Sequence, residues 1–150
     1  SVPPHAGPAD SLRALRVTGV KTALWTGRDR ESGAWLLREH GFEDLFDTVI
    51  YGDDLPTHKP DPEGLQEIMR FLDTTPAATL FVGDADVDVL GGVACGVDTL
   101  LIRHGREIAG PVAAQAWQSV ATVAAAFELV QRLALESGAG GEKSPNRPAQ

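Results

Sequence analysis

The stretch TLFVGDADVDVLGGVACGVDTLLI, residues 79–102, decides the fold, because it places a strand, a helix and a second strand one after the other. Residues 79–82 form a short apolar run, which is typical of a buried strand. Residues 87–95 have helical spacing of apolar side chains, and residues 97–102 are again apolar. Short apolar strands joined by a helix are typical of a parallel sheet covered on both faces.

The same alternation of strands and helices extends outward in both directions. Further strands are predicted at residues 20–25, 48–51 and 116–120, and helices at residues 12–16, 36–40, 62–72 and 124–135. This order predicts an α/β, Rossmann-like fold that is doubly wound, with a mostly parallel sheet and helices on both faces. We expect residues 1–136 to form this domain. The Gly, Ser, Pro and polar residues of 137–150 predict a disordered tail.

The composition of the chain excludes several classes of protein. Its formal net charge of -8 repels nucleic acids and anionic membranes, so we expect neither as a partner. The single cysteine, Cys95, leaves no internal disulfide framework. No apolar run approaches the roughly 18 residues of a membrane span, and the first residues are unlike a signal peptide. We therefore expect a cytoplasmic location.

Residues with useful chemistry follow the predicted strands, where ligands bind in open α/β sheets. They combine a hydroxyl group, a lysine and an acidic cluster, which suits a phosphoryl group beside a hard cation. Thr26 and the backbone N–H groups that follow it, beginning with Gly27, could hydrogen-bond phosphate oxygens, and Lys59 could neutralise them. Asp84 and Asp88 could hold Mg²⁺, which prefers few carboxylates and several waters.

Each of these residues also has a plainer interpretation. A threonine after a strand is more often a helix N-cap than a ligand, and a lysine in an exposed loop is usually solvated. The acidic run that begins at Asp84 starts like a calcium loop, but Val89 stands where that loop needs glycine and Cys95 where it needs glutamate. The calcium interpretation therefore fails.

Three stretches together are more specific than any single residue: ALWTGRDRE at 23–31, VIYGDDLPTHKPDPEGL at 49–65 and LFVGDADVDVLGGVACGV at 80–97. In order and spacing they resemble the haloacid dehalogenase superfamily, most closely its phosphoglycolate phosphatase-like branch, over about residues 8–120. The resemblance implies a Mg²⁺-dependent phosphatase that acts on a small phosphorylated metabolite.

The resemblance also implies a role for each matching residue. Thr26 would bind the transferring phosphoryl group and Lys59 would stabilise its charge, so these two are the expected catalytic residues. Gly27 would share in phosphate binding. Asp84 and Asp88 would serve the Mg²⁺ site.

One part of the family's pattern is missing from the chain. The family's nucleophile is the first Asp of an apolar strand that ends in D-x-D-G-T, and the second Asp is the general acid and base. No such stretch precedes Thr26, and the helical cap domain is missing too. Asp84 and Asp86 have the bare D-x-D spacing, but Gly83 before them and Asp88 after them fit the metal motif better. Because the family's missing strand lies in the middle of the sheet, we expect an incomplete core with unpaired strand edges and an open core face.

Two hypotheses follow, and they belong to different functional classes. The chain is either the C-terminal part of a larger enzyme, whose missing N-terminal segment or a partner chain supplies the nucleophile strand, or a degenerate, non-catalytic binding or regulatory module. A receiver-like domain is excluded, because Asp53, Asp54 and Lys59 occur in the wrong order along the strands. Under either hypothesis the chain alone is expected not to hydrolyse phosphate esters, since Thr26 and Lys59 cannot attack phosphorus.

Overall fold

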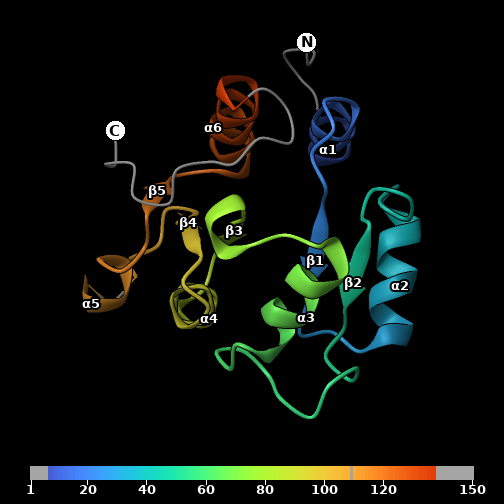
Figure 1. Ribbon diagram of the computed structural model, residues 1–150, viewed down its shortest axis with the longest axis horizontal. Coiled ribbons are helices and arrows are strands. Elements are labelled where there is room, and N and C mark those ends of the chain that lie inside the picture. The colour runs from blue at the N-terminus through green and yellow to red at the C-terminus, as the bar shows by residue number, and fades with distance from the viewer. Residues whose placement is uncertain (1–6, 109, 138–150) are drawn as a thin grey trace.

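The computed structural model describes residues 7–108 and 110–137, in which strands and helices alternate along the chain (Figure 1). The strands are β1 (Ala23–Trp25), β2 (Thr48–Ile50), β3 (Leu80–Gly83), β4 (Asp98–Ile102) and β5 (Gln118–Val120). The helices are α1 (Pro8–Val17), α2 (Arg30–Glu39), α3 (Glu63–Leu72), α4 (Asp86–Ala94), α5 (Gly110–Ala113) and α6 (Val123–Glu136), with a 3-10 turn at Pro76–Ala78. The α/β fold class is thereby confirmed.

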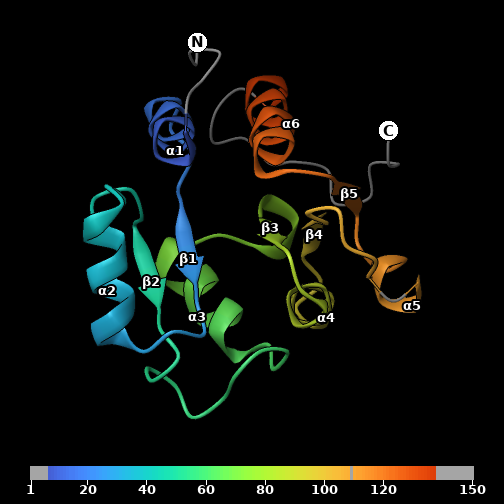
Figure 2. The same ribbon diagram turned by 180° about the vertical axis from the view of Figure 1, so that it is seen from behind.

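The strands form two separate parallel half-sheets. The β1–β2 half-sheet pairs Ala23 with Thr48, and the β3–β5 half-sheet, in the order β3-β4-β5, pairs Leu80 with Asp98. Within the described part of the chain, no strand pairing joins β1 to β3. Figures 1 and 2 show these two strands facing each other across the middle of the molecule.

Local signals explain why the helices begin and end where they do. The Asp29 carboxylate accepts a hydrogen bond from the Ser32 N–H at 2.7 Å and caps α2. The Thr122 hydroxyl caps α6 by accepting from the Ala125 N–H at 3.1 Å. α3 ends at Asp73, whose φ of 53° breaks the helical repeat.

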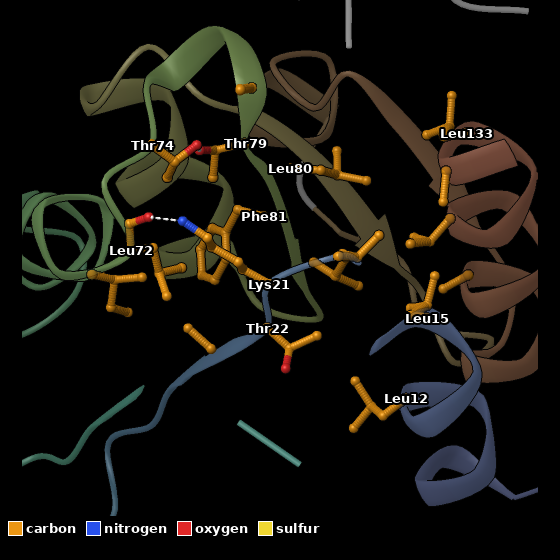
Figure 3. A pocket seen from close by; sticks show the side chains of 18 of the residues that line it. Leu12, Leu15, Lys21, Thr22, Leu72, Thr74, Thr79, Leu80, Phe81 and Leu133 are labelled. Atoms are coloured by element: carbon orange, nitrogen blue, oxygen red, sulfur yellow. Dashed lines mark hydrogen bonds between the residues drawn. The ribbon is translucent and has the colours of Figure 1, made fainter. Parts of the chain in front are cut away.

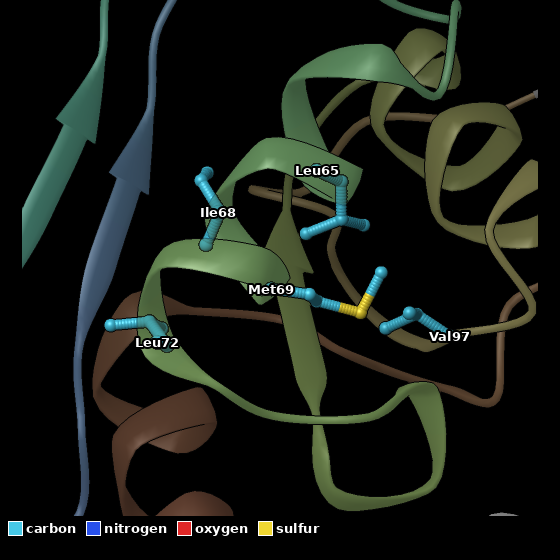
Figure 4. Packing of buried hydrophobic residues seen from close by; sticks show 5 residues of the cluster. All are labelled: Leu65, Ile68, Met69, Leu72 and Val97. Carbon is cyan, nitrogen blue, oxygen red and sulfur yellow. The ribbon is translucent and has the colours of Figure 1, made fainter.

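The best-packed core lies beneath α3, whose apolar stripe faces both half-sheets (Figure 4). Leu65, Ile68, Met69, Leu72 and Val97 are buried there. Trp25 of β1 and Phe81 of β3 pack against this cluster, with their ring centroids 5.6 Å apart. α3 therefore connects the two half-sheets through side chains, although their backbones are not paired.

The opposite face of the sheet is covered differently. Leu100 and Ile102 of β4 pack against Ala126 of α6, and α1 lies beside α6 (Figures 1 and 2). A cavity of about 590 Å³ opens between these two helices and the facing sides of β1 and β3 (Figure 3). The predicted open core face is therefore present in the structure.

Each predicted strand and helix is present, but two helices begin well before their predicted starts: α1 begins at Pro8 rather than at residue 12, and α2 at Arg30 rather than at residue 36. The first strand starts at Ala23 rather than at residue 20, because residues 19–22 lead out of α1 and the regular pairing with β2 begins at Ala23 and Thr48. Neither the four-residue helix α5 nor the 3-10 turn was predicted. The predicted tail falls, beyond Ser137, outside the described residues. None of the described helices is long and apolar enough to cross a bilayer.

Candidate active site

The predicted site residues lie at the carboxyl ends of two strands and in the loop before α3. Thr26 directly follows β1, and its backbone N–H donates to the Ile50 carbonyl at 3.0 Å, as though it continued the strand pairing. The Thr26 hydroxyl accepts a hydrogen bond from the Arg28 N–H at 3.2 Å. Asp84 directly follows β3. The end of each half-sheet therefore presents one predicted site residue.

Lys59 joins the two half-sheets at this end. Its Nζ donates to the Asp88 Oδ1 at 2.9 Å and to the Trp25 carbonyl oxygen at 3.2 Å. The same ammonium lies 5.3 Å from the centroid of the Trp25 ring, within the range of a cation–π contact. The side chains of Lys59 and Asp88 are only 17% and 8% exposed. Lys59 is therefore held by the fold, and the interpretation of a solvated loop lysine does not apply.

Asp88 also shapes the turn after β3. Its Oδ2 accepts hydrogen bonds from the N–H groups of Asp84 at 3.0 Å and Ala85 at 3.1 Å. A Cβ at Gly83 would lie 2.6 Å from the Asp88 carboxyl carbon, so the close approach requires glycine. Because both Asp88 oxygens already have protein partners, the carboxylate faces inward. The Asp84 side chain, 56% exposed, faces solvent.

Thr26, Gly27 and Lys59 line one small pocket together. Its volume of about 20 Å³ suits roughly one water molecule. A Cβ at Gly52 would lie 2.8 Å from the Gly27 carbonyl carbon, which shows how closely the loops after β1 and β2 approach. His58 also lines this pocket. Residues that carry a hydroxyl and an ammonium therefore line one space with the backbone of Gly27, a combination of groups suited to an oxyanion.

Two further polar side chains reach Asp84 from the loop after β4. Arg106 donates from Nη2 to the Asp84 carbonyl oxygen, and the His104 Nε2 lies 3.4 Å from the Asp84 Oδ2. Sequence reasoning assigned no role to either residue at this site. The available signal was their position shortly after a strand end, on the same edge of the sheet as Asp84.

The acids after β2 have a structural task. The Asp54 carboxylate accepts from Arg30 Nη2 with 2.8 Å to each oxygen, and Asp53 accepts from the Arg30 N–H at 2.9 Å. Burial raises the pKa of Asp54, but the Tyr51 N–H and the Arg30 guanidinium together lower it below its ordinary value. These bonds tie the loop after β2 to the start of α2, so Asp53 and Asp54 are not free to act as a ligand set.

The next question is whether Asp84 and the acidic side chains near it could hold a metal ion. Across residues 7–108 and 110–137, no three His, Cys, Asp or Glu side chains gather closely enough to enclose a metal ion. Asp84 and Asp88 are two carboxylates beside one turn, and Mg²⁺ keeps several waters and needs few protein oxygens. The Asp84 carboxylate is exposed to solvent, whereas the Asp88 carboxylate is already hydrogen-bonded to Lys59 and to the turn after β3. A Mg²⁺ ion at this edge would therefore have Asp84 as its accessible carboxylate ligand.

Comparison with known proteins identifies the family. A sequence profile of the haloacid dehalogenase-like hydrolases matches residues 1–102. This chain belongs to that family, and it is phosphoglycolate phosphatase-like in sequence.

Individual relatives agree with this assignment. The chain is 37% identical over 112 residues to phosphoglycolate phosphatase 1 of Pseudomonas aeruginosa, covering 75% of this chain and 41% of that protein. It is 34% identical over 103 residues to the pyrophosphatase PpaX of Halalkalibacterium halodurans, covering 69% and 48%. The crystal structure of a HAD phosphatase from Thermococcus onnurineus superposes with a TM-score of 0.71 at 26% identity, covering 92% and 60%. The chain thus spans less than half the length of these two curated relatives.

Proposed function

We propose that this chain carries the phosphoryl-binding and metal-binding part of a Mg²⁺-dependent phosphatase that acts on a small organic phosphate. The contact between Lys59 and the buried Asp88, beside the pocket of Thr26 and Gly27, carries the proposal. The buried ion pair with Asp88 fixes the Lys59 ammonium at a strand end, where it can offer positive charge and hydrogen bonds to a bound anion. The relatives named phosphoglycolate phosphatase and pyrophosphatase support a phosphate substrate, and phosphoglycolate is the better-supported kind.

Each residue has a defined task in this proposal. The Thr26 hydroxyl and the Gly27 N–H donate hydrogen bonds to the oxygens of the phosphoryl group. Lys59 neutralises the charge that develops on those oxygens, and Asp88 positions its ammonium. Asp84 and Asp88 would hold Mg²⁺, which supplies further charge neutralisation when it is bound.

The attacking group in this proposal is a carboxylate from a segment outside these 150 residues. Its oxygen bonds to phosphorus while the ester P–O bond breaks, and the departing alcohol takes a proton from a second carboxyl group. Water then gives a proton to the second carboxylate and attacks the phosphorus of the acyl phosphate, which releases inorganic phosphate and restores both carboxyl groups to their starting states. Thr26 and Lys59 stabilise both steps without themselves attacking.

Phosphate binding by the chain tests this proposal directly. Titration calorimetry with inorganic phosphate and Mg²⁺ should detect binding by the chain, weakened at least tenfold in Lys59→Met. Lys21→Met is the control, because the Lys21 ammonium likewise donates to a backbone carbonyl, the Leu72 oxygen at 2.6 Å, and lies outside this pocket. Its phosphate affinity should stay within twofold of the unaltered chain.

A second variant keeps the test informative if Lys59→Met destabilises the fold by leaving Asp88 unpaired. Thr26→Val keeps the side-chain shape and removes the hydroxyl, and it should weaken phosphate binding severalfold in a chain that circular dichroism shows to be folded. Phosphate affinity unchanged in both variants contradicts the proposal. Phosphate binding without turnover, even when a carboxylate-bearing strand is supplied, favours a non-catalytic binding module instead.

A further inference from the structure

Arg106, in the loop that follows β4, is a fixed cation at the edge of the candidate site. Its Nη2 donates a hydrogen bond to the backbone carbonyl of Asp84, and its Nε donates to the carbonyl of Arg103 at 3.2 Å. Both acceptors are neutral backbone groups, and among the described residues Arg106 forms no ion pair with a carboxylate. The guanidinium is therefore held in place while its positive charge has no partner.

Two other arginines show the contrast with an arginine that serves the fold alone. Arg16 donates from both terminal nitrogens to the carboxylate of Asp47, and Arg30 donates to both oxygens of Asp54. In these two places the charge of the guanidinium is neutralised within the structure. Arg106 instead keeps its charge, and the N–H groups of its Nη1 stay available to a ligand.

The backbone of the loop that carries Arg106 is also fixed. The N–H of Arg103 donates to the Val120 carbonyl and the N–H of His104 to the Ala121 carbonyl, both at 2.9 Å. His104 has a φ of 52°, a left-handed conformation that a residue with a side chain keeps only where the surrounding structure holds it. A cation that is already ordered loses less conformational entropy when it binds a ligand than a mobile one.

A series of hydrogen bonds connects Arg106 to the phosphoryl-binding residues. Arg106 bonds to the Asp84 carbonyl, and the Asp84 N–H donates to the Asp88 Oδ2 at 3.0 Å. The other oxygen of Asp88 accepts from the Lys59 Nζ at 2.9 Å. Lys59 and Arg106 are therefore two cations at the same edge of the sheet, each fixed to one end of this series.

The carboxylate of Asp84 does not occupy Arg106. Its Oδ2 lies 3.4 Å from the Nε2 of His104, and Arg106 bonds to the backbone oxygen of Asp84 instead. In the proposed function this carboxylate is the accessible ligand of Mg²⁺, and the ion offsets its negative charge when it is bound. An anion near Arg106 is then attracted by the guanidinium without an opposing free carboxylate.

We propose that Arg106 binds a second anionic group of the substrate, a carboxylate or a second phosphate, while Lys59 and Thr26 bind the phosphoryl group that is transferred. The planar fork of a guanidinium matches the oxygens of either group. The substrate class is therefore a small phosphoryl compound with two anionic groups, and not an ester whose remaining part is uncharged. The inference rests on the proposed function for the place of the phosphoryl group, whereas the unpaired charge of Arg106 rests on its own contacts.

Two ligands that differ only in the second anionic group test this assignment on the 150-residue chain. Phosphoglycolate carries a carboxylate where ethyl phosphate carries a methyl group, and their phosphoryl ends are the same. Titration calorimetry at one free Mg²⁺ concentration should show that the chain binds phosphoglycolate about tenfold more tightly, as expected of one charge-assisted contact. Pyrophosphate is the third ligand, and its affinity relative to phosphoglycolate shows which second anionic group Arg106 prefers.

Matched variants locate the preference. Arg106→Met should reduce the preference for phosphoglycolate over ethyl phosphate to about twofold or less, with the affinity for ethyl phosphate nearly unchanged. Arg103→Met is the control, because it removes the same charge from the same loop at a side chain whose Nε donates to the Ser119 hydroxyl at 3.2 Å. Its preference should equal that of the unaltered chain. The same loss of preference in both variants overturns the assignment, and so does equal weakening of both ligands by Arg106→Met.

Amide NMR spectra of the unaltered chain give a readout that does not depend on the folding of a variant. Phosphoglycolate should shift the amide signals of residues 103–107 more than ethyl phosphate does. The two ligands should shift the signals of Thr26 and Gly27 alike. Identical shifts at residues 103–107 with both ligands overturn the assignment.

The outcomes separate this inference from the proposed function. Equal affinity of the unaltered chain for phosphoglycolate and ethyl phosphate rejects the role of Arg106 and retains the phosphoryl site. Binding of neither ligand rejects both. Shifts at residues 103–107 that glycolate alone reproduces, with no ligand shifting Thr26 or Gly27, retain an anion site at Arg106 and reject the phosphoryl site.

Discussion

The face of the sheet beneath α3 and the face beneath α1 and α6 are built from the same strands, yet they differ in packing. Beneath α3, Trp25 and Phe81 from the two half-sheets are in contact with one continuous buried cluster. Beneath α1 and α6, the apolar side chains surround a cavity of about 590 Å³. The difference shows that the side chains of α3 can hold two half-sheets together while the backbone between them is interrupted.

The interruption has a chemical consequence at the carboxyl ends of the strands. Lys59 spans the gap there, bonded to the end of β1 and to Asp88 of α4. The charged groups of the candidate site are therefore positioned although the middle of the sheet is open. The packed face supports the stabilising residues, and the open face is where the attacking group is expected to enter.

The largest predicted effect is on phosphate ester hydrolysis, because the attacking group is expected to enter at the open face. The chain alone should hydrolyse an aryl phosphate with Mg²⁺ no faster than a buffer control, since no carboxylate is in line for attack. If a segment that supplies the attacking carboxylate restores turnover, Lys59→Ala should lower kcat on the order of 10²-fold, as expected when a group stabilises transition-state charge. Turnover by the isolated chain that disappears in Asp84→Asn would instead make Asp84 the nucleophile.

The second prediction compares how much stability a leucine-to-alanine substitution removes on each of the two faces. Leu65→Ala, beneath α3, should reduce the free energy of unfolding by about 2–5 kcal/mol, because it opens a new cavity in a packed core. Leu12→Ala, in the wall of the existing cavity, should cost about 1 kcal/mol or less, since few contacts are lost. Urea denaturation of both variants measures the difference. Equal losses would show that the two faces are equally packed.

A smaller effect tests the close packing of α3 against β1. A Cβ at Gly64 would lie 2.8 Å from the Cζ2 atom of the Trp25 ring, so Gly64→Ala should destabilise by about 1–3 kcal/mol through overpacking. Gly110→Ala is the control, because no atom lies within 4 Å of its added Cβ. Thermal denaturation should separate the two variants. If Gly64→Ala is as stable as the control, the indole is free to move.

The smallest predicted effect is a dependence of stability on pH. It arises from Asp47 and Asp54, which lie just before and just after β2. Burial raises the pKa of Asp47, but the Thr22 N–H and Arg16 lower it below its ordinary value, and the pKa of Asp54 is lowered in a similar way. A depressed folded-state pKa stabilises the fold above the ordinary aspartate pKa of about 4, and this stabilisation is lost as the pH falls below it.

Urea midpoints measured between neutral pH and pH 3 check this dependence. Asp47→Asn should lower stability at neutral pH and reduce the further loss on acidification. Asp10→Asn, which removes an ion pair exposed to solvent with Arg13, is the control and should leave the pH dependence unchanged. An unchanged slope in Asp47→Asn would assign the acid sensitivity to other carboxylates.

Much of the fold was predictable because its signals are local. The stripe of Leu65, Ile68, Met69 and Leu72 repeats with helical spacing, and α3 is found at Glu63–Leu72 with that stripe buried. The apolar run before Asp84 likewise predicted β3 to within one residue. α5 was not predicted, because its four residues, Gly110–Ala113, carry no periodic pattern.

The sequence predicted which residues belong to the candidate site better than it predicted how they contact one another. The positions of Thr26, Lys59 and Asp84 after strands or in an adjoining loop indicated one edge of the sheet. Nothing in the spacing indicated that Arg106 would reach the Asp84 carbonyl, because that contact depends on how the loop after β4 folds back over a neighbouring strand.

The sequence by itself determined the order of strands and helices, since each depends on the periodicity of a few neighbouring residues, and it placed the polar residues at the strand ends. Only the tertiary structure decided that Asp88 faces inward, with one oxygen on Lys59 and the other on the turn after β3. It also decided that, among the described residues, β1 and β3 are not paired with each other and flank a cavity with mostly apolar walls. The physical reason is that both features depend on contacts between residues distant along the chain, and such contacts leave no periodic trace in a single sequence.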